Sequence, residues 1–391
     1  MEINLTFETF ITHKPLYYKE IDHKRVHFAY AVLKPYLKRP LIVHLVGTNG
    51  KGSTGRIMAT LLHESGKSVG HFSSPHILKF NERIWIDGED ISDDVLEKSH
   101  QALYAILGQK MSDGLSYFEY TTLLALVATQ SMDVLILEAG LGGEFDATNI
   151  VEKELSVITP IGLDHQDFLG NSIKEIAQTK LNSMDKKVLL ARQVHDEVYD
   201  VAEEVARLKN TTLYRVGLEE SPKLLKMTEE LGWAYYLYEN TQLALQALDI
   251  LELPYKLNSL NRVVLFGRFY EIFPNVIVDV GHNLLAVQTL IRALEKKYNN
   301  EKIILVYNSL DDKDYQSILL LFKPLLKRVE IINLETHRAV KSEELKNILE
   351  KLDIEYREFM FLNKNDKYFI FGSFFVVEAF LKKIKYSIKN K

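Results

Sequence analysis

The chain has 391 residues, of which 47% are hydrophobic and 26% are charged, and its formal net charge is −5. This length predicts two or three domains, and the modest negative charge provides no general attraction to nucleic acid or anionic membranes. The absence of cysteine excludes disulfides, cysteine-ligated metals and thiol catalysis. With no apolar stretch long enough to span a bilayer and no basic and apolar leader at its start, the chain is expected to be cytoplasmic, without nucleic-acid or membrane partners.

The first part of the chain alternates predicted strands and helices. Short apolar runs predict strands at Leu41–Val46, Val69–Phe72, Val134–Leu137 and Leu155–Thr159. Apolar side chains at helical spacing predict helices at Ser53–Ser65 and Thr121–Thr129, and a further helix is expected from Ile173. Strands separated by helices favour the α/β class, with a mostly parallel sheet covered on both faces.

A second α/β block begins near Asn261. Strands are predicted at Val276–Val280, Ile303–Val306, Val329–Ile332 and Phe369–Phe371, and an amphipathic helix is predicted at Leu284–Tyr298. The helical period of Leu243–Leu251 gives way to a stretch, Leu253–Phe266, that contains proline and asparagine. We therefore predict two domains, residues 1–260 and 261–391.

A glycine-rich run carries the strongest functional signal. It follows the first apolar strand, opens a helix, and consists of Gly47, Thr48, Asn49, Gly50, Lys51, Gly52 and Ser53. Glycines allow backbone N–H groups to converge on phosphate oxygens, and the helix N-terminus adds free donors. Lys51 would neutralise the β and γ phosphates, and the Ser53 hydroxyl would bind a phosphate or lie near the metal. The run therefore predicts a nucleotide-binding phosphate loop.

This loop resembles that of the folylpolyglutamate synthase group within the Mur ligase superfamily. Further motifs of that group follow in the same order: Ser73–His76, Asn81–Ile84, Tyr117–Glu119, Glu138–Asn149, Leu163–His165, Lys180, Gly267–Arg268, Asp279–Asn283, Asp312–Asp314 and Gly372–Ser373. The resemblance therefore covers nearly the whole chain.

The resemblance implies a fold and a reaction. The expected fold is an N-terminal phosphate-loop ATPase domain of Mur-ligase type, followed by a smaller C-terminal Rossmann-like α/β domain, with the active site in the cleft between them. The expected enzyme is an ATP- and Mg²⁺-dependent ligase. It phosphorylates the carboxylate of dihydropteroate or of a folate (poly)glutamate, and the amine of L-glutamate then attacks the acyl phosphate.

The resemblance also assigns the metal site. Glu138 ends a strand beside the phosphate loop, a position suited to a metal ligand, and Ser74 and His165 complete the implied ligand set. Lys180 matches a superfamily lysine that is often carbamylated, although the residues around it differ from the family pattern. An exposed helical lysine is an equally good interpretation of Lys180.

Other matches concern the substrates. Tyr117, Phe118 and Asp146 match positions that meet the pterin, although Phe118 is also compatible with a core residue. Arg268 and Asp279 match contacts to ATP, and His282 matches a position near the incoming glutamate. Asn240 is a candidate adenine or ribose contact, and as a residue expected at a helix start it could equally be an N-cap.

Two alternatives share parts of this pattern. Asn363–Asp366 matches the guanine-reading motif of GTPases and would suggest a nucleotide switch, but four polar residues between two predicted strands are more simply a turn. A cell-wall amino-acid ligase of the same superfamily would share the ATP chemistry. The favoured enzyme is a monomeric, bifunctional dihydrofolate and folylpolyglutamate synthase, with a monofunctional folylpolyglutamate synthase as the alternative.

Overall fold

The computed structural model describes residues 5–14, 22–217 and 219–386. Their packing forms two compact units. The first unit runs to Gly162 and includes Gln166–Glu219 and Asn240–Val263, whereas the second comprises Leu163–His165, Glu220–Glu239 and the chain from Val264 onward. The domain division at residues 260 and 261 remains a prediction, and these units differ from it by assigning two earlier segments to the second unit.

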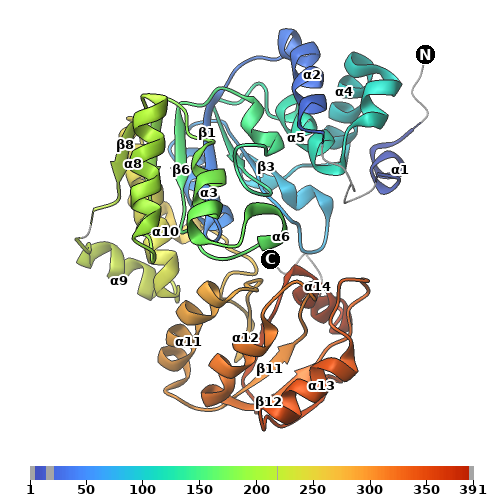
Figure 1. Ribbon diagram of the computed structural model, residues 1–391, viewed down its shortest axis with the longest axis vertical. Coiled ribbons are helices and arrows are strands. Elements are labelled where there is room, and N and C mark those ends of the chain that lie inside the picture. Colours follow the sequence, from blue (N-terminus) through green and yellow to red (C-terminus); the bar gives the residue numbers. More distant parts are fainter. Residues whose placement is uncertain (1–4, 15–21, 218, 387–391) are drawn as a thin grey trace. The chain divides into compact units, whose positions relative to one another are not determined.

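The first unit is built on a mostly parallel sheet with the strand order β4-β3-β2-β5-β1-β6-β7-β8 (Figure 1). Its strands are β1 (Leu41–Val46), β2 (Val69–Phe72), β3 (Ile84–Ile86), β4 (Glu89–Asp90), β5 (Val134–Glu138), β6 (Leu155–Ile158), β7 (Lys187–Leu190) and β8 (Thr212–Arg215). β3 and β4 pair antiparallel at one edge. The central strand β1 is buried between β5 and β6, so its carboxyl end lies in the middle of the sheet.

Helices cover both faces of this sheet. They are α1 (Phe7–Thr12), α2 (His23–Leu33), α3 (Lys51–His63), α4 (Asp93–Gly114), α5 (Tyr117–Ala128), α6 (Gln166–Leu169), α7 (Ile173–Leu181), α8 (Glu197–Lys209) and, from Asn240 onward, α10 (Tyr235–Ile250). The intervening α9 (Pro222–Glu230) belongs to the second unit. Ile42 and Val46 of β1 join the cores formed with α5 and α7, respectively. Leu45 faces the other way and packs against α3 at Gly55.

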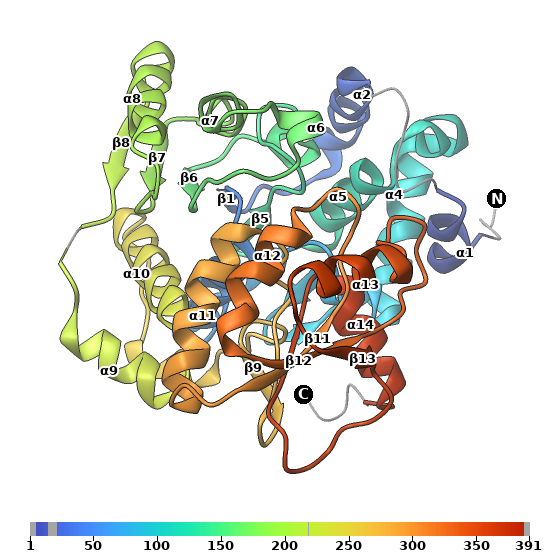
Figure 2. The same cartoon turned by 60° about the horizontal axis from the view of Figure 1, so that its bottom comes forward.

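The second unit contains a smaller parallel sheet with the order β13-β12-β11-β14-β10-β9, in which β9 alone runs antiparallel to its neighbour (Figure 2). The strands are β9 (Tyr270–Phe273), β10 (Val276–Val278), β11 (Ile303–Tyr307), β12 (Leu326–Ile331), β13 (Tyr356–Glu358) and β14 (Tyr368–Phe371). Helices α11 (Leu284–Tyr298), α12 (Tyr315–Phe322) and α13 (Ser342–Lys351) share one core with the sheet. α14 (Phe374–Lys383) packs against β14.

These two α/β units confirm the predicted fold class. One local prediction is wrong: Asn240 does not begin a helix but lies inside α10, where its residue is 5% exposed. The N-cap interpretation of Asn240 is therefore excluded. No helix in the described part of the chain combines the length and the hydropathy that crossing a bilayer requires.

Candidate functional site

The predicted phosphate loop connects β1 to α3 and requires glycine at two positions. Gly47 has φ +152°, and a Cβ there would lie 2.0 Å from the hydroxyl oxygen of Thr159. Gly50 has φ +90°, and a Cβ there would lie 2.7 Å from the amide oxygen of Asn240. Any larger side chain would displace these neighbours and strain the backbone. At both glycines the backbone of the loop therefore packs directly against a neighbouring residue, Thr159 or Asn240.

Hydrogen bonds to a neighbouring segment hold the loop in place. The backbone N–H groups of Thr48 and Asn49 both donate to the Pro160 carbonyl, at 2.9 and 3.3 Å. The Thr48 hydroxyl donates to the Gly162 carbonyl at 3.1 Å and accepts from the Gly162 N–H at 3.1 Å. Because this segment follows β6, two adjacent strand ends of the central sheet position the loop.

Two lysines converge on one carbonyl of the loop. The Lys51 ammonium donates to the carbonyls of Gly47 and Thr48 at 3.1 and 3.3 Å, and the Lys180 ammonium donates to that of Gly47 at 2.9 Å. Lys180 is 4% exposed, so the interpretation of it as an exposed helical lysine is wrong. Two cations at a loop that opens a helix suit a polyphosphate anion.

Buried polar atoms beside the loop have no partner within the described residues. They are the hydroxyls of Ser53 and Thr54 in the first turn of α3 and the side-chain nitrogen of Asn240. By contrast, Thr60 in the same helix donates its hydroxyl to the Arg56 carbonyl at 2.9 Å. Since unpaired buried polar groups are costly, these atoms fit a ligand that supplies oxygen or nitrogen partners.

Two of the three predicted metal ligands lie together at the end of β5. Glu138 is 5% exposed, and the Ser74 backbone N–H donates to its carboxylate at 3.4 Å. His165 belongs to the second unit. No cluster of three or more His, Asp or Glu side chains suited to a metal occurs among the described residues. A magnesium ion held here would therefore need hydroxyl, water or phosphate oxygens in addition, which is the coordination it prefers.

The predicted pterin residues Tyr117 and Phe118 form the first turn of α5. A capping box between Ser116 and Glu119 fixes this helix start, because each side chain accepts from the other residue's backbone N–H. The Phe118 ring lies against Gly140, where an added Cβ would come within 2.6 Å of it. Both aromatic residues are partly buried at the edge of the first unit's core. This placement is compatible with either a ring platform or a core residue.

Asp146 has a structural function that the sequence did not reveal. Its carboxylate accepts from the N–H groups of Gly140, Leu141 and Thr148 at 2.9, 2.8 and 2.9 Å, and also from the Thr148 hydroxyl. It thereby caps the short helical turn Ala147–Ile150 and closes the glycine-rich loop after β5. Burial raises the pKa of Asp146, and these hydrogen bonds oppose the shift. Its contact with a pterin stays a prediction.

Asp279 follows β10 and organises the loops around it. Its carboxylate accepts from the Tyr236 hydroxyl at 2.9 Å and from the N–H groups of Phe269 and Gly281, both at 2.7 Å. Burial raises the pKa of Asp279, and the charge of Arg268 counteracts that effect. The three hydrogen bonds to the Asp279 carboxylate hold together the segments that carry Tyr236, Phe269 and Gly281. The predicted contacts of Asp279 and Arg268 with ATP stay predictions.

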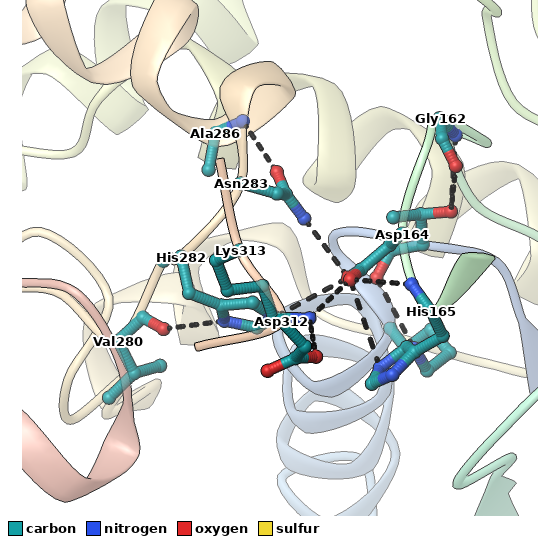
Figure 3. A network of polar contacts seen from close by, with 12 residues as sticks. Gly162, Asp164, His165, Val280, His282, Asn283, Ala286, Asp312 and Lys313 are labelled. Atoms are coloured by element: carbon teal, nitrogen blue, oxygen red, sulfur yellow. Dashed lines mark hydrogen bonds and ion pairs between the residues drawn. The ribbon is translucent and has the colours of Figure 1, made fainter. Parts of the chain in front are cut away.

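His282 lies in a polar network centred on Asp164 (Figure 3). The His282 Nε2 atom is 3.4 Å from the Asp164 carboxylate, and the Lys313 ammonium is 2.6 Å from it. Asn283 donates to the same carboxylate through its side-chain nitrogen at 3.3 Å. Burial would raise the pKa of Asp164, but the hydrogen bond and charge of His282, with the charges of His165 and Lys313, hold this pKa well below its usual range.

Sequence reasoning assigned no role to Asp164 or Lys313. Both lie in matched family motifs, Leu163–His165 and Asp312–Asp314, and that was the available signal. Lys313 is also 3.0 Å from Asp312, and its side chain is 6% exposed. His165 has a left-handed backbone conformation, with φ +51°.

The guanine-reading alternative does not fit the geometry of its motif. Residues 363–366 lie in the turn between β13 and β14, as the sequence predicted. The Asp366 carboxylate pairs with Lys327 at 2.7 Å and approaches Arg328 at 3.7 Å. Since two cations already occupy this carboxylate, it is not presented to a base.

Comparisons with curated proteins and with solved structures find relatives that match most of this chain. No family model matches the chain. The dihydrofolate synthase/folylpolyglutamate synthase of Haemophilus influenzae is 32% identical over 395 residues, covering 87% of this chain and 88% of the relative. The crystal structure of Helicobacter pylori folylpolyglutamate synthetase is 38% identical, with a TM-score of 0.79 and coverage of 97% of this chain and 98% of that one.

Two further solved structures contain ligands. Escherichia coli FolC in complex with DHPP and ADP is 27% identical, with a TM-score of 0.83, and the match covers 98% of each chain. A bifunctional folylpolyglutamate synthase/dihydrofolate synthase with Mn, AMPPNP and L-glutamate bound is 26% identical, with a TM-score of 0.79 and 97% of each chain covered.

Proposed function

The chain belongs to the dihydrofolate synthase/folylpolyglutamate synthase family, and on that premise we propose that it is an ATP-dependent ligase that joins L-glutamate to a pterin or folate carboxylate. The observation that carries the proposal is the phosphate loop with its two converging lysines, in a chain that matches such synthases over most of their length. In this reaction the γ-phosphoryl group of ATP passes to the carboxylate. The amine of glutamate then displaces phosphate, forming an amide and releasing a proton.

The phosphate loop performs the nucleotide half of this reaction. Backbone N–H groups from Gly50 to Ser53 bind the phosphates, Thr48 and Asn49 hold the loop that presents them, and Lys51 neutralises charge on the group being transferred. The unpartnered Ser53 hydroxyl bonds a phosphate oxygen or faces the metal. Asn240 contacts the nucleotide through its unpartnered nitrogen, and Arg268 and Asp279 bind the same nucleotide.

A divalent cation fits the oxygen-rich surroundings of Glu138. Ser74 and Glu138, with His165, are the protein residues proposed to hold Mg²⁺. When bound, Mg²⁺ neutralises phosphate charge and aligns the transferred group. Lys180, buried against the loop carbonyl of Gly47, keeps the loop closed in its unmodified form and is the proposed site of carbamylation.

Substrate choice follows the first named relative. We assign the chain both activities, the addition of glutamate to dihydropteroate and to folate glutamates, because the Haemophilus influenzae synthase carries both in its name. Tyr117, Phe118 and Asp146 are the proposed pterin contacts, and His282 lies beside the incoming glutamate. We further propose that the protein acts as a monomer in the cytoplasm.

The decisive experiment measures phosphate release from ATP with Mg²⁺, with and without L-glutamate, while dihydropteroate and tetrahydrofolate are supplied separately. Release that requires glutamate and occurs with both pterins would establish the bifunctional ligase. Release with tetrahydrofolate alone would reduce the assignment to a monofunctional folylpolyglutamate synthase. Release that is independent of glutamate, or that prefers GTP, would overturn the proposal.

Nucleotide binding itself gives a second prediction. Gly50→Ala is expected to weaken ADP binding by at least about 10-fold, because the new Cβ strains a positive φ and meets Asn240. Isothermal titration of ADP with Mg²⁺, without other substrates, measures this effect. Gly66→Ala is the matched control, since it also has positive φ but no atom lies within 4 Å of an added Cβ. Equal affinities in both variants would contradict the proposed role of the loop.

A further inference from the structure

Asp164 lies in a short segment that packs with the second unit although its chain neighbours belong to the first. Leu163–His165 group with the second unit, whereas Gly162 and Gln166 belong to the first. The Asp164 side chain is 7% exposed. A buried carboxylate in a three-residue segment needs partners, since an unpaired buried charge is costly.

Those partners are the adjacent His165 backbone and side chains of two other loops, and together they contact both carboxylate oxygens (Figure 3). One oxygen accepts from the Lys313 ammonium at 2.6 Å and from the His165 N–H at 2.9 Å. The other lies 3.4 Å from His282 Nε2 and accepts from the Asn283 side chain at 3.3 Å. The loop after β10 and the loop after β11 are therefore joined through a single carboxylate.

The same carboxylate fixes the orientation of the His282 ring. His282 Nδ1 is 3.2 Å from the Val280 carbonyl, which can only accept, so this nitrogen donates. Nε2 faces the Asp164 carboxylate, so the Val280 carbonyl contacts one ring nitrogen and Asp164 contacts the other. Lys313 is held in the same way between Asp164 and Asp312. Without Asp164, the ring would retain one anchor and Lys313 would pair with Asp312 alone.

We infer that Asp164 is a positioning residue, which fixes the His282 ring and the Lys313 ammonium for the glutamate-binding half of the reaction. This inference rests on the proposed function, in which His282 lies beside the incoming glutamate. Asp164 itself transfers no group. It acts by holding the His282 ring and the Lys313 ammonium, which come from different loops, in one fixed arrangement beside the amino acid.

The test is Asp164→Asn, which keeps the size of the side chain and removes its charge. The KM for glutamate is expected to rise by at least about 10-fold, while the KM values for ATP and for the pterin change by less than about 2-fold. Asp312→Asn is the matched control, because it removes the other partner of Lys313 and leaves His282 anchored. It is expected to change the glutamate KM by less than about 3-fold.

A spectroscopic measurement separates positioning from folding and from activity. In ¹⁵N-labelled protein, the His282 ring signals are assigned by their loss in His282→Gln. Asp164→Asn is expected to shift them, and Asp312→Asn is expected to leave them in place, while both variants melt near the wild-type temperature. Unshifted His282 signals, or an equal rise of all three KM values, would overturn the role of Asp164. Absence of glutamate-dependent turnover in the wild type would instead overturn the proposed function.

Discussion

Lys51→Ala is expected to lower glutamate-dependent phosphate release by about 1,000-fold or more. Lys51 is the first residue of α3, and its ammonium lies within 3.3 Å of two loop carbonyls. Its charge is therefore already placed where phosphates would bind. A preorganised cation that meets developing charge contributes about 4 kcal/mol to a barrier, which corresponds to this loss. Initial rates of phosphate release, with ATP saturating, measure it.

The fold should survive this change, because Lys51 is half-buried and its ammonium donates to two carbonyls of the loop rather than forming part of a core. Its melting temperature should stay within about 3 °C of the wild type. Lys51→Arg keeps the charge but not the compact ammonium, and partial activity is expected from it. A Lys51→Ala protein that retains more than about a tenth of the wild-type rate would remove Lys51 from the transfer step.

The sequence predicted the buried elements more accurately than their ends. The strand Leu41–Val46 and the helix Leu284–Tyr298 were predicted with the bounds that the structure has, because each combines a clear hydrophobic period with a glycine or asparagine at its boundary. The helix predicted from Thr121 begins at Tyr117 instead, since the capping box of Ser116 and Glu119 sets its start. Short or polar edge strands such as Glu89–Asp90 carry no such period.

The candidate site was predictable where its residues are close in sequence. The phosphate loop lies in one run of seven residues, and its strand and helix context could be recognised directly. The Asp164 network could not be recognised, because Asn283 and Lys313 lie 119 and 149 residues away along the chain. Asn240 was predicted at the start of a helix because asparagine is a common N-cap residue. The helix α10 already begins at Tyr235, and the buried Tyr238 is part of it.

The largest expected effect on stability is that of Glu330→Ala in the second unit. Glu330 is fully buried on β12, and one carboxylate oxygen accepts from Arg328 at 2.8 and 2.9 Å and from Arg357 at 2.6 and 2.9 Å. Its other oxygen has no hydrogen-bond partner within the described residues. Among the described residues, removing the carboxylate leaves the buried Arg328 with one more distant anion, Asp366 at 3.7 Å. We expect a loss of about 3 kcal/mol in the free energy of unfolding.

Urea unfolding followed by the fluorescence of Trp233 measures this loss in the second unit. Trp85 is the other tryptophan of the chain and belongs to the first unit, so a Trp85→Phe background isolates the signal. Asp366→Asn is the matched control. Because its partner Lys327 is half-exposed, a change of less than about 1 kcal/mol is expected.

The comparison with Glu330→Met tests the physical cause. Methionine fills the space but also removes the close anion of Arg328, so it should cost nearly as much stability as alanine if the lost charge matters most. If the cost came from the cavity instead, methionine would restore most of the stability. A loss below about 1 kcal/mol in both variants would mean that water or Asp366 compensates Arg328, and the buried carboxylate would then contribute little to this sheet.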